Sequence, residues 1–174
     1  LEADLRELVK KYGLDLHTDI SGAKADEFAR LLPQPSPEPY WKLRFKGGFS
    51  DIFFLTTQGK TPEFTGLMSE LAQIQGFPVH NIGVYIQPVV QGTSCHCEFN
   101  LYYNPSKKAE SNLTGKLAAE AVNRMEEKGA FFSRPYNGWV DVAYRRASDT
   151  AMMQKKVKDI FDPNWILNPG KLCF

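Results

Sequence analysis

The first 39 residues show a helical pattern of apolar positions followed by a proline-rich stretch. Leu5 and Leu8 lie on one face of an expected helix, and Gly13 is typical of a helix end. Ser21 is a candidate N-cap for a second short helix. The four closely spaced prolines that follow exclude regular structure, because proline lacks an amide donor and restrains its predecessor. We therefore expect residues 1–39 to form a helical lead-in and a connector.

The rest of the chain alternates strand patterns with helical patterns. Segments of strand length and strand-like pattern occur at residues 40–46, 50–57, 80–90 and 94–104. Helical patterns begin at Thr61, at Ser111 and near Asp149, and Pro163 stops the last of them. The order strand, strand, helix, strand, strand, helix favours an α+β domain in which helices cover one face of an antiparallel sheet.

Composition and charge exclude several classes of partner. Lys and Arg total 21 against 20 Asp and Glu, so the net charge of +1 offers no basic excess for nucleic acid. No apolar run approaches the roughly 20 residues that a membrane span requires. Three cysteines without a CxxC pair favour a reduced, cytoplasmic setting. The chain starts at Leu1 without a signal-peptide pattern, which we interpret as processing or as a piece of a longer polypeptide.

The segment TSCHCEFNLYY separates polar and apolar residues onto two faces of a strand. Cys95, Cys97, Phe99 and Leu101 share one face, which we expect to be buried. The other face carries His96, Glu98, Asn100 and Tyr102, spaced for contact with a ligand or with water. A metal site is not expected, because the Cys-His-Cys run points its cysteines and its histidine to opposite faces. On the strand pattern alone, the favoured explanation of His96 is a hydrogen-bonded or solvated residue without a ligand.

Two further segments carry candidate binding residues. Arg134 and Tyr136 share a face of an extended stretch, where a guanidinium fork and a phenol hydroxyl could bind a carboxylate or phenolate. A surface ion pair is an equal alternative for Arg134. The run from Asn168 to Lys171 is a tight turn, and it lacks the glycine-rich loop of a phosphate-binding motif.

Four segments, in the same order, resemble the flavin oxidoreductase family that includes vanillyl-alcohol oxidase and 4-cresol dehydrogenase. The tail FDPNWILNPGKL is similar to that family's closing motif, in which an acidic residue, a proline and a short apolar stretch precede a Pro-Gly-Lys turn. SDIFFLTTQGKTPEF resembles an aromatic strand that enters a helix, and CHCEFNLYYNP resembles the cap-domain strand that carries a histidine. EEKGAFFSRPY resembles the segment that delivers an arginine to the substrate. For residues 40–174 this implies the ferredoxin-like, C-terminal substrate (cap) domain of an FAD-linked oxidase.

The resemblance implies a role for each matching residue. Arg134 would bind the negative charge of a phenolate or carboxylate, or stabilise reduced flavin. Tyr136 would line the substrate pocket beside it. His96 and Glu98 would lie near the substrate or the flavin ring.

The resemblance also implies FAD as the cofactor, held mainly by a domain that residues 1–174 do not contain. Asn168 and Lys171 would lie where the tail returns toward that domain. The implied reaction is hydride transfer from an alcohol or phenolic substrate to the flavin. Asp51 stands near the place where covalently flavinylated relatives carry a His or Tyr, so we expect no covalent flavin link through this domain.

The chain departs from the D-2-hydroxyacid members of the family, which carry a metal site. Their Glu-His-Gly falls at Pro135-Tyr136-Asn137, and their upstream histidine falls within Val89 to Gln91. Neither element is present here. A metal ion and a metal-assisted hydroxyacid substrate are therefore not expected.

The expected partners are an FAD-binding domain on the same or another chain and a small-molecule substrate. A homodimer through the cap region is the common state of the larger family. The chain by itself is expected to be inactive. Two alternatives stay open: a stand-alone α+β binding or structural domain, and one subunit of a split flavoenzyme.

Overall fold

The computed structural model describes residues 2–17, 21–22, 24–31, 33, 40–89, 92–134 and 139–169. The chain divides into two compact units, Leu1–Trp41 and Lys42–Phe174. The boundary lies close to the predicted end of the connector. Among the described helices, none combines the length and the apolar character that a bilayer span requires.

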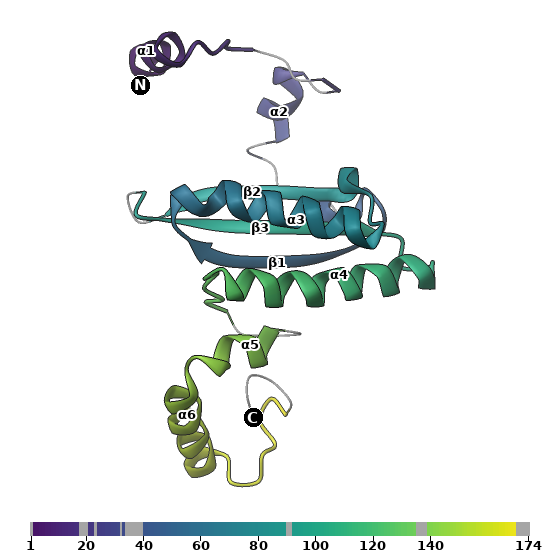
Figure 1. Cartoon of the computed structure of the whole chain (residues 1–174), viewed down its shortest axis with the longest axis vertical. Helices are drawn as coiled ribbons and strands as arrows, with labels where there is room; N and C mark the ends of the chain where they lie inside the picture. Colours follow the sequence, from purple (N-terminus) through teal and green to yellow (C-terminus); the bar gives the residue numbers. More distant parts are fainter. Residues whose placement is uncertain are drawn as a thin grey trace. The chain divides into compact units, whose positions relative to one another are not determined.

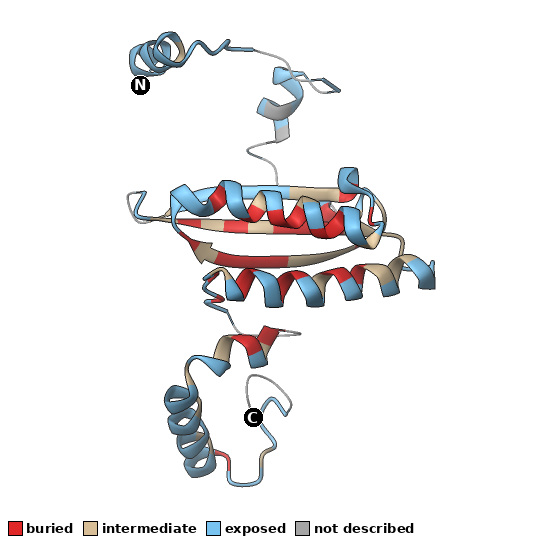
Figure 2. Ribbon diagram, in the orientation of Figure 1, coloured by how far each residue is buried: buried red, intermediate tan, exposed pale blue. Residues whose placement is uncertain are grey.

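The first unit holds two of the predicted helices. Helix α1 spans Glu2–Tyr12 and has no buried residue, so its apolar stripe lies exposed (Figure 2). Helix α2 spans Ala25–Leu31 and begins several residues after Ser21, which therefore does not cap it. The amide of Lys24 donates instead to the Glu27 carboxylate at 3.4 Å, in the manner of a capping box.

The second unit is built on a three-stranded antiparallel sheet with the strand order β1-β3-β2 (Figure 1). The strands are β1 (Gly48–Thr56), β2 (Ile82–Val89) and β3 (Ser94–Tyr103). Leu55 at the end of β1 also forms a bridge with Phe131, which follows helix α4. A β-α-β-β-α chain with a further extended residue beside β1 is the ferredoxin-like arrangement. The predicted α+β class and antiparallel sheet are confirmed.

Helices α3 (Thr61–Gln75) and α4 (Lys108–Glu127) cover one face of this sheet (Figure 1). Their buried residues meet the inward residues of the strands in one apolar core (Figure 2). The core includes Ile52, Phe54, Cys97, Phe99 and Leu101 from the sheet, Phe64, Leu67, Met68 and Leu71 from α3, and Leu117, Ala121, Val122 and Met125 from α4. The predicted burial of the Cys95–Leu101 face is confirmed, because its four members are 0–1% exposed.

The remaining elements are short helices and turns. They are η1 (Trp41–Leu43), η2 (Gln58–Lys60), η3 (Val79–Asn81), α5 (Val140–Arg145) and α6 (Ser148–Phe161). Helix α6 matches its prediction, whereas α5 was not predicted. Helix α4 begins three residues before Ser111, so Ser111 lies inside its first turn rather than at its cap.

The predicted strand at residues 40–46 is wrong. The structure forms the η1 turn there, and the amide of Gly47 donates to the Leu43 carbonyl at 2.8 Å. These local hydrogen bonds replace the ladder that a strand would need. Gly47 then takes a φ of +84°, a left-handed conformation that glycine adopts without strain, and directs the chain into β1. Lys42 in this turn is buried.

Candidate functional site

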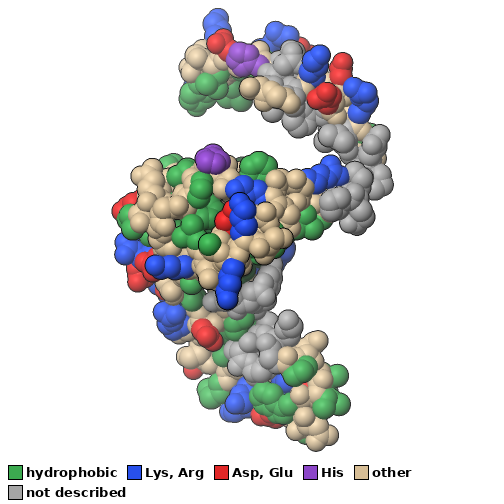
Figure 3. Space-filling model, turned by 90° about the vertical axis from the view of Figure 1, so that its right-hand side faces the viewer, with side chains coloured by type: hydrophobic (Ala, Val, Ile, Leu, Met, Phe, Trp, Pro, Cys, Tyr) green, Lys and Arg blue, Asp and Glu red, His purple; other side chains and the backbone are tan. Residues whose placement is uncertain are grey.

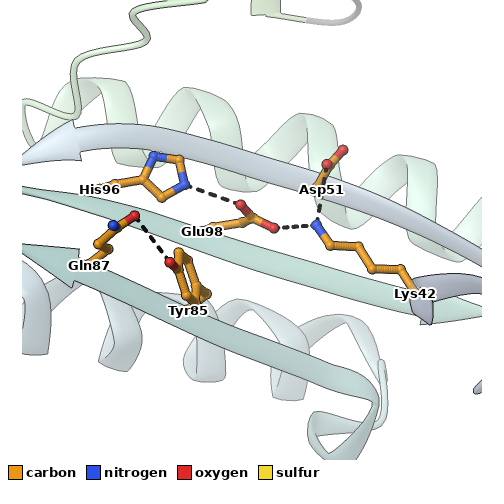
Figure 4. A network of polar contacts seen from close by, with 6 residues as sticks. All are labelled: Lys42, Asp51, Tyr85, Gln87, His96 and Glu98. Carbon is orange, nitrogen blue, oxygen red and sulfur yellow. Dashed lines mark hydrogen bonds and ion pairs between the residues drawn. The ribbon is translucent and has the colours of Figure 1, made fainter. Parts of the chain in front are cut away.

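The sheet face opposite α3 and α4 carries a row of polar side chains from all three strands. On β3 these are His96, Glu98 and Asn100. The register pairs Glu98 with Phe53 on β1 and with Tyr85 on β2. Paired residues of neighbouring strands point to the same face, so the three strands present these groups together (Figure 4).

Glu98 lies at the centre of this face and bonds to groups on both sides. One carboxylate oxygen accepts a hydrogen bond from the Lys42 ammonium. The other lies 3.1 Å from Nε2 of His96. The same ammonium lies 3.8 Å from the Asp51 carboxylate, which is more exposed (Figure 4). His96, Glu98, Lys42 and Asp51 therefore form one connected polar network.

The network keeps Glu98 ionised. Its burial would by itself raise the pKa of the carboxyl. The hydrogen bonds from Lys42 and His96 and the charge of Lys42 outweigh that effect, so the pKa of Glu98 falls below its ordinary value of 4.5. The Lys42 side chain is only 9% exposed. A buried ammonium must be paired, and Glu98 provides that pairing.

Aromatic rings enclose the histidine. The Phe53 ring stacks on the imidazole of His96 with ring centres 5.7 Å apart. The Tyr85 ring meets it edge-on at 5.9 Å. The Tyr85 hydroxyl donates to the side-chain carbonyl of Gln87 at 3.1 Å. The imidazole is thus held in one orientation by two rings and one carboxylate.

Arg134 reaches the same cluster from the segment after α4. Its guanidinium carbon lies 5.9 Å from the centre of the Phe53 ring, the ring on which His96 also stacks. The indole N–H of Trp139 donates to the Arg134 carbonyl at 3.0 Å, and the Trp139 ring packs edge-on against Phe53 at 5.6 Å. The structure therefore brings together His96, Glu98 and Arg134, which the sequence had only placed on separate segments.

Two predicted site residues lie outside the described residues, namely Tyr136 and Lys171. The third tail residue, Asn168, is exposed and takes a left-handed φ of +49°. It lines a groove of about 1040 Å³ beside α6, well separated in sequence from the sheet cluster. Within the described residues, Asn168 makes no contact with His96 or Arg134.

The acidic residue of the tail has a structural role. The buried Asp162 carboxylate accepts hydrogen bonds from the Lys158 ammonium at 2.7 Å and from the amides of Ile166 and Leu167 at 2.9 and 3.0 Å. Lys158 lowers the pKa of Asp162 most, burial opposes it, and the two amides lower it further. Lys158 also donates to the Leu167 carbonyl at 2.8 Å. Asp162 thus folds the Asp-Pro-Asn-Trp-Ile-Leu run into a fixed turn.

The cysteines of β3 face the core. Burial, with a smaller contribution from Cys95, raises the pKa of the Cys97 thiol to about 11. A metal ligand must be a thiolate, so Cys97 is poorly suited to that role. Among the described residues, no group of three His, Cys, Asp or Glu side chains is arranged to hold a metal ion.

Sequence reasoning missed three residues of the cluster. Lys42 was predicted only as part of the strand at residues 40–46, which does not form, and Phe53 and Tyr85 were predicted only as parts of strands. No local pattern reveals the Lys42–Glu98 pair, because the two residues lie 56 positions apart. Strand alternation in β1 could have placed Phe53 opposite the core residues Ile52 and Phe54.

The cluster fits a planar or anionic ligand. It combines a cation, an imidazole, a carboxylate and aromatic rings. Figure 3 shows Lys and Arg side chains on one face of the molecule, with Asp and Glu side chains among them. A phenolate and a flavin ring are both ligands of that kind.

Comparison with known proteins found a family match and a structural match. Residues 142–172, which contain most of α5 and all of α6, match the family model described as FAD linked oxidases, C-terminal domain. No curated protein shows significant similarity to the chain. Among solved structures, the chain is similar to 4-ethylphenol oxidase from Gulosibacter chungangensis in its isoeugenol complex, with a TM-score of 0.60 and 20% sequence identity.

The structural match covers 71% of this chain and 24% of the 4-ethylphenol oxidase chain, so the chain spans about a quarter of that enzyme's length. At 20% identity this match shows a shared fold. The family match covers the tail motif that the sequence analysis had singled out. The two findings thus relate residues 142–172 to the C-terminal domain of FAD linked oxidases, and the fold of the chain to that of 4-ethylphenol oxidase.

Proposed function

We propose that this chain is the substrate-side part of an FAD-dependent oxidoreductase that oxidises an alcohol or a phenolic substrate. The observation that carries the proposal is the meeting of His96, Glu98 and Arg134 around the Phe53 ring, on the sheet face that α3 and α4 leave uncovered. The family match of the tail and the shared fold with a phenol oxidase support the same conclusion.

In this proposal each residue acts on the substrate through a stated group. The Arg134 guanidinium binds a phenolate or carboxylate, or stabilises the charge that develops during the reaction. The His96 imidazole hydrogen-bonds a substrate hydroxyl, and Glu98 orients the imidazole. Tyr136, which lies outside the described residues, lines the pocket. Bound FAD would supply the hydride acceptor.

The partner in this proposal is an FAD-binding domain, on the same chain or on another. Helix α6 has no buried residue, and Val157, Ile160 and Phe161 are 49%, 74% and 80% exposed. Figure 3 shows hydrophobic side chains gathered over this C-terminal part. An exposed apolar face of this size favours a missing domain or subunit over a stand-alone protein. We propose Asn168 and Lys171 as residues on the side of that partner.

The experiment is an absorption spectrum of the protein purified under native conditions from its natural source, with any polypeptide that accompanies it. The two visible bands of oxidised flavin should appear, and they should bleach when a phenol or alcohol substrate is added without oxygen. Acid precipitation should release the flavin, because Asp51 is paired with Lys42 and offers no His or Tyr for a covalent link. A correctly folded protein without flavin would contradict the proposal and favour a binding or structural domain.

A further inference from the structure

Lys42 is the least exposed charged group of the sheet face. Neither the family resemblance nor the proposed function gives this residue a role. It comes from the η1 turn, and its ammonium lies between Asp51 on β1 and Glu98 on β3 (Figure 4). Burying an ammonium is unfavourable unless its charge is compensated. The position of Lys42 is therefore explained by the group it pairs with, and through that group it acts on His96.

The two carboxylate oxygens of Glu98 contact different groups, a cation and the imidazole. Oε1 accepts from the Lys42 ammonium, and Oε2 lies 3.1 Å from Nε2 of His96. An ionised carboxylate has only acceptor atoms, so the hydrogen of this contact belongs to Nε2. The neutral imidazole then carries a free lone pair on Nδ1. Within the described part of the chain, Nδ1 makes no hydrogen bond.

Charge compensation keeps Glu98 an acceptor. Burial opposes ionisation of this carboxyl, but the hydrogen bonds from Lys42 and His96 and the charge of Lys42 hold its pKa below the ordinary value of 4.5. Asp51 lies 3.8 Å from Lys42, but its side chain is 33% exposed and is screened by water. Within the described ranges, the charged and titratable groups around this network are Lys42 (η1), Asp51 (β1), Tyr85 (β2), Glu98 (β3) and Arg134 (the segment after α4).

We propose that Lys42, acting through Glu98, holds His96 in the tautomer that carries its hydrogen on Nε2, so that Nδ1 accepts a hydrogen bond from the hydroxyl of the substrate. Lys42 is a positioning residue in this arrangement. The identity of the hydroxyl as that of an alcohol or phenol rests on the proposed function, whereas the state of the ring rests on the contacts alone.

The state of the ring can be measured in the full chain without flavin or substrate. Long-range proton–nitrogen NMR distinguishes the two neutral tautomers and the imidazolium. The chain has three histidines, His17, His80 and His96, so a His96→Gln variant assigns the signals of His96. At pH 7 we expect a protonated Nε2, whose hydrogen exchanges slowly, and an unprotonated Nδ1. A ring hydrogen on Nδ1 in the wild type would overturn the inference, and this test needs no variant to fold.

Variants of Lys42 test the role of the cation. Lys42→Met should leave the Glu98 carboxylate without its cationic partner, so the hydrogen on Nε2 of His96 should exchange faster with water and the tautomer protonated on Nδ1 should appear. Lys42→Arg should restore the wild-type spectrum. Lys46→Met is the matched control, since Lys46 lies in the same turn region and pairs with Glu110 at 3.9 Å instead. An unchanged His96 spectrum in folded Lys42→Met would overturn the role of Lys42.

Steady-state kinetics of the flavin-loaded protein provide a second, independent test of the role of Lys42. Lys42→Met should lower kcat by about tenfold or more, because a general base contributes on the order of 100- to 10,000-fold. Lys42→Arg should restore most of kcat, and Lys46→Met should leave it unchanged. A loss that Lys42→Arg does not restore in a folded protein would make Lys42 merely structural and overturn the inference. A protein without flavin activity would contradict the proposed function and leave the NMR result intact.

Discussion

The pair between Lys42 and Glu98 should stabilise the fold far more than an ion pair of similar geometry on the surface. The Lys42 and Glu98 side chains are 9% and 14% exposed. A hydrogen bond to a charged group contributes about 1.5–3 kcal/mol, and removal of one partner of a buried pair costs about 3–5 kcal/mol. Because this pair is buried only in part, we expect a coupling free energy of about 2 kcal/mol.

The assay is a double-mutant cycle of Lys42→Met and Glu98→Gln, with the free energy of unfolding measured by urea denaturation and circular dichroism. The control is the same cycle on Lys128 and Glu63, whose atoms are 2.7 Å apart but whose side chains are 38% and 45% exposed. Water screens exposed pairs, so the control coupling should be much smaller. Equal coupling in the two cycles would refute the idea that burial makes the Lys42–Glu98 contact strong.

The pH dependence of this coupling has a definite sign. The pKa of Glu98 is lower in the folded chain than its ordinary value of 4.5, because the bonds from Lys42 and His96 outweigh the opposing effect of burial. A depressed carboxyl pKa contributes stability that is fully present above the unfolded value and is lost as the pH falls through the folded value. The coupling should therefore persist at neutral pH and fade below about pH 4.5. A coupling that grows on acidification would contradict this assignment.

Three further predictions test other parts of the structure. In the flavin-loaded protein, Arg134→Lys keeps the charge but loses the planar fork, so turnover of an anionic substrate should fall by about tenfold or more; unchanged kinetics would remove Arg134 from the site. Asp162→Asn should loosen the tail turn and speed its limited proteolysis, and lowering the pH of the wild type through the depressed pKa of Asp162 should do the same; an unaffected cleavage rate would argue against Asp162 as the organiser of the turn. In a Cys173→Ser background, Cys95 and Cys97 should react with a thiol reagent only after unfolding, because both are buried and the pKa of Cys97 is raised to about 11; rapid labelling of the native chain would contradict the packing of β3.

Several features could be predicted from the sequence because they depend on local periodicity. The alternation in β3 separates Cys97 and Phe99 from His96 and Glu98, and it holds in the structure because strand residues alternate between faces whatever the surroundings. The spacing of apolar residues likewise predicted α3, α4 and α6. The tail motif identified a resemblance that the family match of residues 142–172 supports.

Other features could not be predicted because they depend on contacts between distant segments. Residues 40–46 alternate as a strand would, yet they form a turn, because local hydrogen bonds hold the backbone and Lys42 is buried against Glu98, which lies 56 positions away. The bridge between Leu55 and Phe131 brings the segment of Arg134 to the Phe53 ring on which His96 stacks.

The sequence by itself thus determined the α+β class, the inward face of β3, the main helices and the residue types available for binding an anion or a hydroxyl. Only the tertiary structure decided that His96, Glu98 and Lys42 form one network and that Arg134 shares an aromatic ring with it. The physical reason is that backbone periodicity is encoded within a few neighbouring residues. Charge pairing is decided by which segments the packed core brings within hydrogen-bonding distance.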